Sequence, residues 1–129
     1  MGLFFKKKIL VVEDSKPLAN AAAIKLKSLG YKVLFAESYK EAVSVLGENK
    51  KIVAVWLDHW LRDNSNGLEV LKYIRKDKVF INTPVFLVSN CGEEWSKQYI
   101  EAGISKSFVK SDHSMSDIIE SINHEIDLK

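Results

Sequence analysis

Short apolar runs and amphipathic stretches alternate along the chain. The apolar runs have the length and the branched side chains of buried strands. They are Ile9–Val12, Val33–Ala36, Ile52–Leu57, Val85–Val88 and the weaker Ser107–Lys110. Apolar residues at helical spacing follow each run, at Leu18–Leu29, Tyr39–Leu46, Leu68–Ile74, Trp95–Ala102 and Met115–Ile126. The pattern therefore predicts five successive strand–helix units.

This alternation predicts an α/β fold. Short connections between strands and helices favour a doubly wound parallel sheet with helices on both faces and right-handed crossovers. Residues typical of helix boundaries stand where the pattern needs them: Pro17 in a first turn, Ser38 and Ser114 as N-caps, and Gly30 and Gly103 at helix ends. We expect residues 1–129 to form a single domain.

Composition and charge narrow the functional classes. Hydrophobic residues make up 47% of the 129 residues, enough for a real core, and the formal net charge is +2. A charge so near zero favours neither nucleic acid nor a membrane surface as the main partner. Cys91 is the only cysteine in the sequence, so an intramolecular disulfide is excluded and a reducing, cytoplasmic location is expected.

Polar side chains follow four of the predicted strands. Glu13 and Asp14 come after the first strand and Asp58 after the third, while Ser89 ends the fourth and Lys110 the fifth. In an open parallel sheet, the ligand site lies beyond the carboxyl ends of the strands, so these side chains are expected to converge. Three neighbouring carboxylates need a compensating cation, and oxygen ligands of this kind suit Mg²⁺. The hydroxyl and the lysine suit phosphoryl oxygens.

The segments "ILVVEDS", "VWLD", "FLVSN" and "SFVK", in this order and spacing, resemble the receiver domain of two-component response regulators. The resemblance covers nearly the whole chain. It implies a flavodoxin-like fold with strand order 2-1-3-4-5. It also implies a signalling role rather than enzyme activity on an outside metabolite, in which Asp58 accepts a phosphoryl group with Mg²⁺ present. The donor would be a phosphohistidine on a sensor histidine kinase or a histidine phosphotransfer protein.

The same resemblance implies a role for each residue at the strand ends. Asp14 and Asp58 would bind Mg²⁺ directly, Glu13 would act largely through water, and the backbone carbonyl of Trp60 would complete the protein ligands. In addition, Ser89 would donate a hydrogen bond to the acyl phosphate and Lys110 would pair with it.

Two departures from the family pattern affect the predicted switch. The family usually has a proline after the lysine, in a cis peptide, but here Ser111 follows Lys110. The family's aromatic switch residue corresponds to Ser107. Phe108 is expected to face the opposite side of the strand because side chains alternate.

Further departures surround Asp58 and Ser89. The loop "RDNSNG" is one residue longer than usual before its glycine, and we expect it to be looser. Trp60 and Cys91 occupy the variable positions that tune attacking water, and the Trp60 indole is expected to limit access to the phosphate. Asn90 replaces a residue that is usually small.

Three functions remain open from the sequence. The first is a phosphoaccepting receiver, and the second is a receiver-like interaction module that does not depend on phosphorylation. The third is a Mg²⁺-dependent phosphohydrolase, but Trp60 stands where such enzymes usually carry the aspartate that acts as general acid. Flavin binding is disfavoured because no phosphate-binding loop follows the first strand.

The histidines and several aromatic residues suggest no further chemistry. His59, His113 and His124 are too dispersed for a metal site and are expected at the surface. Trp95, Tyr99 and Phe108 lie in the segments that receivers use for contact with a downstream protein target or an output domain. The surface formed by the helix near Trp95, the fifth strand and the last helix is therefore a candidate homodimer interface, although the spacing fits burial equally well.

Overall fold

The computed structural model describes residues 6–128. Strands and helices alternate throughout, as the hydrophobic pattern predicts. In chain order they are β1 (Lys8–Val12), α1 (Lys16–Ser28), β2 (Lys32–Ala36), α2 (Tyr39–Glu48), β3 (Ile52–Leu57), α3 (Gly67–Lys76), β4 (Val85–Ser89), α4 (Glu93–Glu101), β5 (Lys106–Val109) and α5 (Met115–Asp127). Among the described residues, no helix is both long and apolar enough to cross a bilayer.

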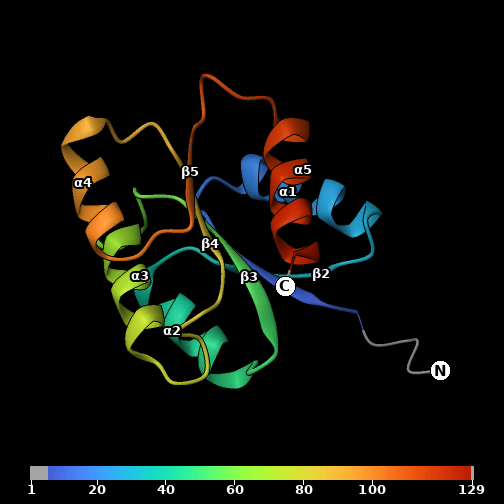
Figure 1. The fold of residues 1–129 in the computed structure, drawn as a ribbon, viewed down its shortest axis with the longest axis horizontal. Coiled ribbons are helices and arrows are strands. Elements are labelled where there is room, and N and C mark those ends of the chain that lie inside the picture. The colour runs from blue at the N-terminus through green and yellow to red at the C-terminus, as the bar shows by residue number, and fades with distance from the viewer. Residues whose placement is uncertain (1–5, 129) are drawn as a thin grey trace.

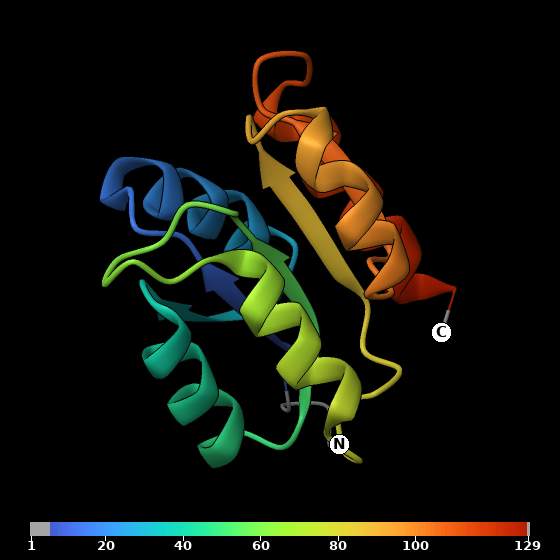
Figure 2. The ribbon, with the colours of Figure 1, turned by 90° about the vertical axis from the view of Figure 1, so that its left-hand side faces the viewer.

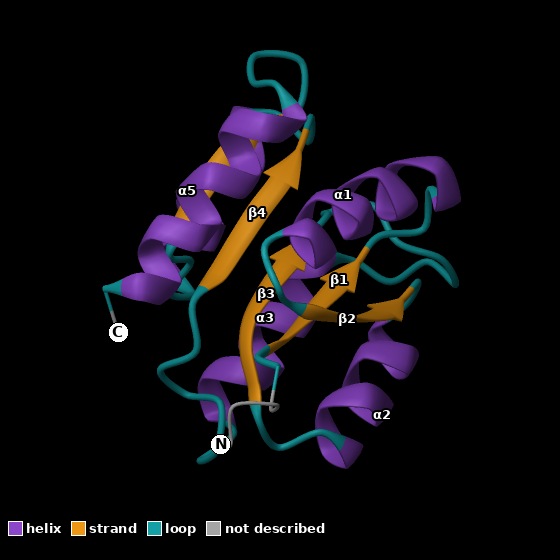
Figure 3. Cartoon of the chain, turned by 90° about the vertical axis from the view of Figure 1, so that its right-hand side faces the viewer, coloured by secondary structure: helices purple, strands orange, loops and turns teal. Residues whose placement is uncertain are grey.

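The strands form one parallel sheet in the order β2-β1-β3-β4-β5. Helices cover both of its faces (Figure 1). Helices α2, α3 and α4 lie on one face, seen from the front in Figure 2. Helices α1 and α5 lie on the other face, seen in Figure 3. The predicted doubly wound fold and its strand order are confirmed.

The sheet separates the apolar core into two clusters, because alternate side chains of a strand point to opposite faces. In β1, Leu10 and Val12 pack in the cluster beneath α2, α3 and α4. Ile9 and Val11 pack in the cluster beneath α1 and α5. All four side chains are fully buried, so β1 is covered on both faces, as its unbroken apolar run requires.

Helix ends follow the chemistry of their boundary residues. Ser38 and Ser114 accept hydrogen bonds from the backbone N–H groups of Glu41 and Asp117, as expected of N-caps. Helix α3 begins with a reciprocal capping box: the Asn66 side chain accepts from the Glu69 N–H, and the Glu69 carboxylate accepts from the Asn66 N–H. This fixes the point at which the chain leaves the loop after β3.

Helix α4 is attached to the sheet less extensively than its neighbours. It has nine residues, and Tyr99 is the one that is buried. Gly92 occupies its N-cap and provides no side-chain hydrogen bond. Burial of apolar area is the main stabilising contribution to a helix of this length, so α4 depends strongly on Tyr99.

Candidate functional site

The carboxylates of Glu13, Asp14 and Asp58 meet at the carboxyl edge of the sheet. The backbone N–H of Glu13 donates to Ala36 O (2.9 Å) and that of Asp58 donates to Val12 O (3.0 Å), so the sheet ladder holds both residues. Glu13 and Asp58 are almost completely buried, and Asp14 is half-buried. One carboxylate oxygen from each of the three lies within 4.8 Å of the others.

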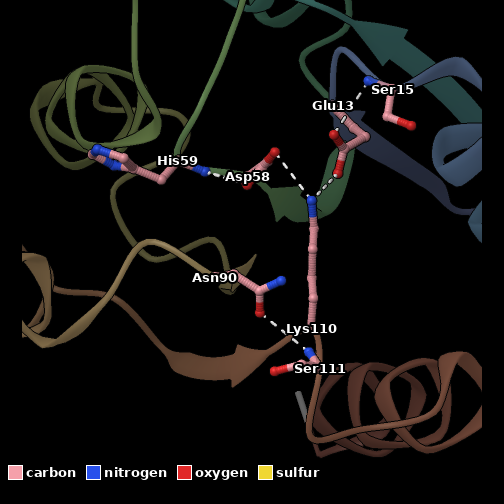
Figure 4. A network of polar contacts seen from close by, with 7 residues as sticks. All are labelled: Glu13, Ser15, Asp58, His59, Asn90, Lys110 and Ser111. Carbon is pink, nitrogen blue, oxygen red and sulfur yellow. Dashed lines mark hydrogen bonds and ion pairs between the residues drawn. The ribbon is translucent and has the colours of Figure 1, made fainter.

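Lys110 reaches this cluster from the end of β5. Its Nζ lies 3.0 Å from Glu13 Oε1 and 3.1 Å from Asp58 Oδ2. Figure 4 shows the extended side chain crossing from β5 to both carboxylates. The other oxygen of Asp58, Oδ1, accepts a 2.7 Å hydrogen bond from the backbone N–H of His59. Both oxygens of Asp58 are therefore fixed, one by a cation and one by an amide.

The crowding of like charges perturbs the acid–base behaviour of the site. Burial and the nearby charge of Asp58 raise the pKa of Glu13 to about 7, although Lys110 counteracts the shift. Burial by itself would lower the pKa of Lys110, but the charges of Asp58 and Glu13 outweigh this effect and raise it. The amine is therefore a permanent cation near neutral pH, facing carboxylates that repel one another.

Ser89 completes the set of side chains at this edge. It ends β4, is 4% exposed, and its hydroxyl has no hydrogen-bond partner within residues 6–128. A buried hydroxyl without a partner is costly, so it is suited to bind an additional oxygen. The donor set thus fits a hard cation with oxygen ligands on one side and a phosphoryl group between Ser89 and Lys110 on the other.

Comparison with known families agrees with this arrangement. The family model described as the response regulator receiver domain matches residues 9–123. The chain belongs to this family. Receiver domains of this family act in two-component signalling.

Two curated relatives illustrate the range of receiver proteins. The chemotaxis protein CheY homolog of Campylobacter jejuni is 32% identical over 105 residues, which cover 80% of each chain. The phosphate regulon transcriptional regulatory protein PhoB of Pseudomonas aeruginosa is 30% identical over 105 residues, covering 81% of this chain and 45% of PhoB. The chain thus spans less than half the length of PhoB.

Solved receiver structures share the fold. The non-phosphorylated HemR receiver domain of Leptospira biflexa superposes with a TM-score of 0.84 at 24% identity, covering 96% of this chain and 97% of that one. A CheY-like receiver domain protein of Methanospirillum hungatei gives a TM-score of 0.84 at 24% identity, with 95% of each chain covered.

The turn after Lys110 is built without the family's proline. No peptide bond within residues 6–128 is cis. The Ser111 N–H instead donates to Asn90 Oδ1 at 3.1 Å, and Lys110 N donates to Ser89 O at 3.3 Å. With this trans peptide, the Lys110 amine lies within ion-pair distance of the carboxylates of Glu13 and Asp58.

Ser107 and Phe108 face opposite sides of β5, as predicted. Phe108 is 6% exposed and packs in the cluster beneath α1 and α5. Ser107 lines a pocket of about 470 Å³ between α4 and β5, to which Ser89 and Cys91 also contribute. This receiver therefore has a hollow beside Ser89 at the side of the sheet where the family carries its aromatic switch residue.

The expectation of a looser loop after Asp58 is wrong. The chain forms a small hairpin in which Trp60 and Asn66 are bridged, and Leu61 N donates to Ser65 O at 3.3 Å. Asp63 and Asn64 both have positive φ values, 63° and 57°, which place them at the tip of the turn. Asp and Asn tolerate this left-handed conformation better than most residues.

The hairpin is also tied to the neighbouring strand connection. Arg62 pairs with Glu37 at 3.0 Å, and Ser65 Oγ accepts from the first N–H of α2, on Tyr39, at 3.0 Å. Gly67 follows the hairpin, and a Cβ at this position would collide with the carbonyl oxygen of Asp58 and lie 2.8 Å from the Tyr99 hydroxyl. A glycine is therefore required where α3 passes the site.

His59 is not at the surface, which corrects the sequence-based expectation. It is fully buried, and its Nδ1 lies 2.6 Å from the Tyr99 hydroxyl. The ring centroid of Trp95 lies 4.1 Å from that of His59, and the centroid of Trp60 lies 4.5 Å away. Burial lowers the pKa of His59, although the charge of Asp58 opposes the shift. His113 and His124 are exposed, as expected.

The aromatic residues of α4 and β5 serve the core rather than an outer surface. Tyr99 and Phe108 are buried and Trp95 is half-buried, so burial is the correct alternative for these residues. Ile100 and Val109 are the exposed apolar side chains of α4 and β5 in the described chain, at 67% and 46% exposure. Trp60 is 56% exposed, with its ring against His59.

Proposed function

We propose that this receiver is phosphorylated on Asp58 by a phosphohistidine of a sensor histidine kinase or a histidine phosphotransfer protein. The observation that carries the proposal is the position of Lys110 Nζ, 3.0 Å from Glu13 and 3.1 Å from Asp58. A fixed cation between two buried carboxylates can later pair with a phosphoryl oxygen, and phosphoryl transfer depends mainly on positioning and charge neutralisation.

In the proposed reaction, a carboxylate oxygen of Asp58 attacks the phosphorus atom. The new O–P bond forms as the P–N bond to the donor histidine breaks, and the imidazole keeps the bonding electrons and leaves as a neutral ring whose other nitrogen already carries a proton. Lys110 neutralises charge on the phosphoryl oxygens. The Ser89 hydroxyl, which lacks a partner within residues 6–128, donates to one of them.

The acidic cluster is suited to Mg²⁺. Asp14 and Asp58 would bind it directly, the backbone carbonyl of Trp60 would add a third ligand, and Glu13 would bind through water. When bound, Mg²⁺ would neutralise the repulsion between carboxylates and phosphate. The proximity of one oxygen each from Glu13, Asp14 and Asp58, within 4.8 Å, supports this ligand set.

The test is labelling with acetyl phosphate, followed by intact mass spectrometry. We expect the parent to gain one phosphoryl group with Mg²⁺ and none with a chelator. Asp58→Asn should remain unlabelled. The matched control is Asp112→Asn, an exposed aspartate in the turn after β5, which should label like the parent. An unlabelled parent would contradict the proposal and favour the receiver-like interaction module that works without phosphorylation.

We further propose that phosphorylation changes the surface of α4, β5 and α5, the candidate interface for a second copy, a downstream target or an output domain. The exposed Ile100 and Val109 support this surface. Light scattering with beryllofluoride and Mg²⁺ should show a mass increase if the chain forms a homodimer. An unchanged monomer mass would exclude the homodimer.

A further inference from the structure

The position of the Lys110 amine depends on the backbone at the end of β5. Strand β5 ends at Val109, and the next residue already begins a turn closed by Asp112 N donating to Val109 O at 3.0 Å. Lys110 must nevertheless direct a long, flexible side chain to two buried carboxylates. Such a side chain has many rotamers, so the direction of its backbone determines how often the amine is in place.

Asn90 holds this turn from the neighbouring loop. It is the residue after β4, and its side-chain oxygen accepts the 3.1 Å hydrogen bond from Ser111 N. Figure 4 shows the amide of Asn90 directed at the backbone immediately beyond Lys110. The backbone N–H of Lys110 also donates to Ser89 O, at 3.3 Å. The N–H groups of Lys110 and of the next residue, Ser111, are therefore both hydrogen-bonded to residues at the end of β4.

We propose that Asn90 is a positioning residue that keeps the Lys110 amine at the phosphoryl site by restraining the Ser111 backbone. The inference rests on the proposed phosphorylation of Asp58. A side chain without an acceptor at residue 90 would leave the Ser111 N–H to water. The turn would then be free to rotate, and the amine would spend less time between Glu13 and Asp58. Asn90 itself does not contact the Asp58 carboxylate among the hydrogen bonds of residues 6–128.

The first measurement is the rate of labelling by acetyl phosphate with Mg²⁺. Asn90→Ala should slow labelling by about fivefold, since small misplacements of a charge-neutralising group reduce rates steeply. The matched control is Ser111→Ala, which removes the hydroxyl of Ser111 but keeps the N–H that donates to Asn90. It should label at the parental rate. Asn90 is exposed, so the variant is expected to fold, and circular dichroism would check this.

The second measurement reports on the amine directly. The ammonium resonance of Lys110, assigned by its loss in Lys110→Ala, should be sharp in the parent and in Ser111→Ala because the group is held between two carboxylates. It should broaden or disappear in Asn90→Ala.

The outcomes separate the two proposals. If the parent does not label, the proposed function fails. If the parent labels but Asn90→Ala labels equally fast, the role of Asn90 is overturned. It is also overturned if labelling slows while the Lys110 resonance is unchanged, because Asn90 would then act by another route.

Discussion

The imidazole of His59, the residue after the proposed phosphoacceptor, shares a 2.6 Å hydrogen bond with the hydroxyl of Tyr99 in α4. Both residues are fully buried. The backbone N–H of the same histidine donates to Asp58 Oδ1. His59 therefore contacts the reactive carboxylate through its backbone and α4 through its side chain.

Tyr99→Phe should destabilise the protein although it removes a single oxygen. His59 Nδ1 would lose its partner, and Nε2 already has none within residues 6–128. A buried polar group left unsatisfied costs about 1–3 kcal/mol, and urea unfolding should show a loss of this size. Tyr39→Phe is the matched control, because the hydroxyl of Tyr39 makes no hydrogen bond within the described chain. An equal loss in both variants would show that the His59 contact contributes nothing specific.

Glu13 should contribute less to the stability of the metal-free protein as the pH rises from about 4.5 to about 7. Glu13 has a pKa of about 7 in the folded protein against an ordinary value of 4.5, so the folded state retains a proton that the unfolded state has released. The contribution of Glu13 to the free energy of unfolding then declines across this interval and levels off above it. His59, whose pKa is lowered by burial, contributes in the opposite direction. Glu13→Gln removes this contribution, so the parent should lose stability relative to the variant across the interval, as measured by urea unfolding at each pH. A parent and a variant with parallel profiles would contradict the buried-carboxylate explanation.

Lys110→Ala should bind Mg²⁺ more tightly than the parent, by severalfold. The amine lies within ion-pair distance of Glu13 and Asp58, and its removal takes a competing positive charge from the acidic cluster. Tryptophan emission during Mg²⁺ titration should report the change, because the exposed Trp60 lies two residues from Asp58. Lys106→Ala, which removes an exposed lysine of β5, should bind like the parent. Weaker binding in Lys110→Ala would show that the lysine helps to assemble the metal site.

Ser65→Ala should cost more stability than Arg62→Ala, although Arg62 forms the ion pair between the hairpin and Glu37. Ser65 Oγ accepts from Tyr39 N and donates to Arg62 O, and the loss of these bonds should cost about 1–2 kcal/mol. The Arg62 side chain of the Arg62–Glu37 pair is half exposed to solvent, which screens the interaction, so its loss should cost at most about 0.5 kcal/mol. The comparison requires only denaturant midpoints, and the reverse order would refute it.

The fold and the central site were predictable because both depend on local pattern. Buried runs of four to six residues alternate with helical spacing, and a parallel sheet gathers the residues at its strand ends along one edge. Glu13, Asp58 and Lys110 could therefore be placed together before any long-range contact was known. The capping box of Asn66 and Glu69 was not predicted, although asparagine and glutamate stand three residues apart before an apolar run.

The contacts of His59 could not be predicted in the same way. Nothing in "LDHWL" distinguishes an exposed from a buried histidine, because its partner Tyr99 lies forty residues further along the chain. The order of the loop after Asp58 was missed for a similar reason. Its hydrogen bonds to Glu37 and Tyr39 are made with another strand connection, and sequence length alone does not show such bonds. The sequence did contain one signal for a shared partner, because Trp95 and Tyr99 stand four residues apart and so lie on one face of a helix. In the structure both rings lie against His59.

The sparse anchoring of α4 has a consequence for local unfolding. A helix with one buried residue and no side-chain cap at its N-terminus can detach at a smaller free-energy cost than the sheet, which must lose two packed faces at once. Amide hydrogens of α4 should therefore exchange with solvent well before those of β1 and β3. Tyr99 anchors α4 and also binds His59, the residue after Asp58. One hydrogen bond therefore links the backbone at Asp58 to the helix that is expected to open first.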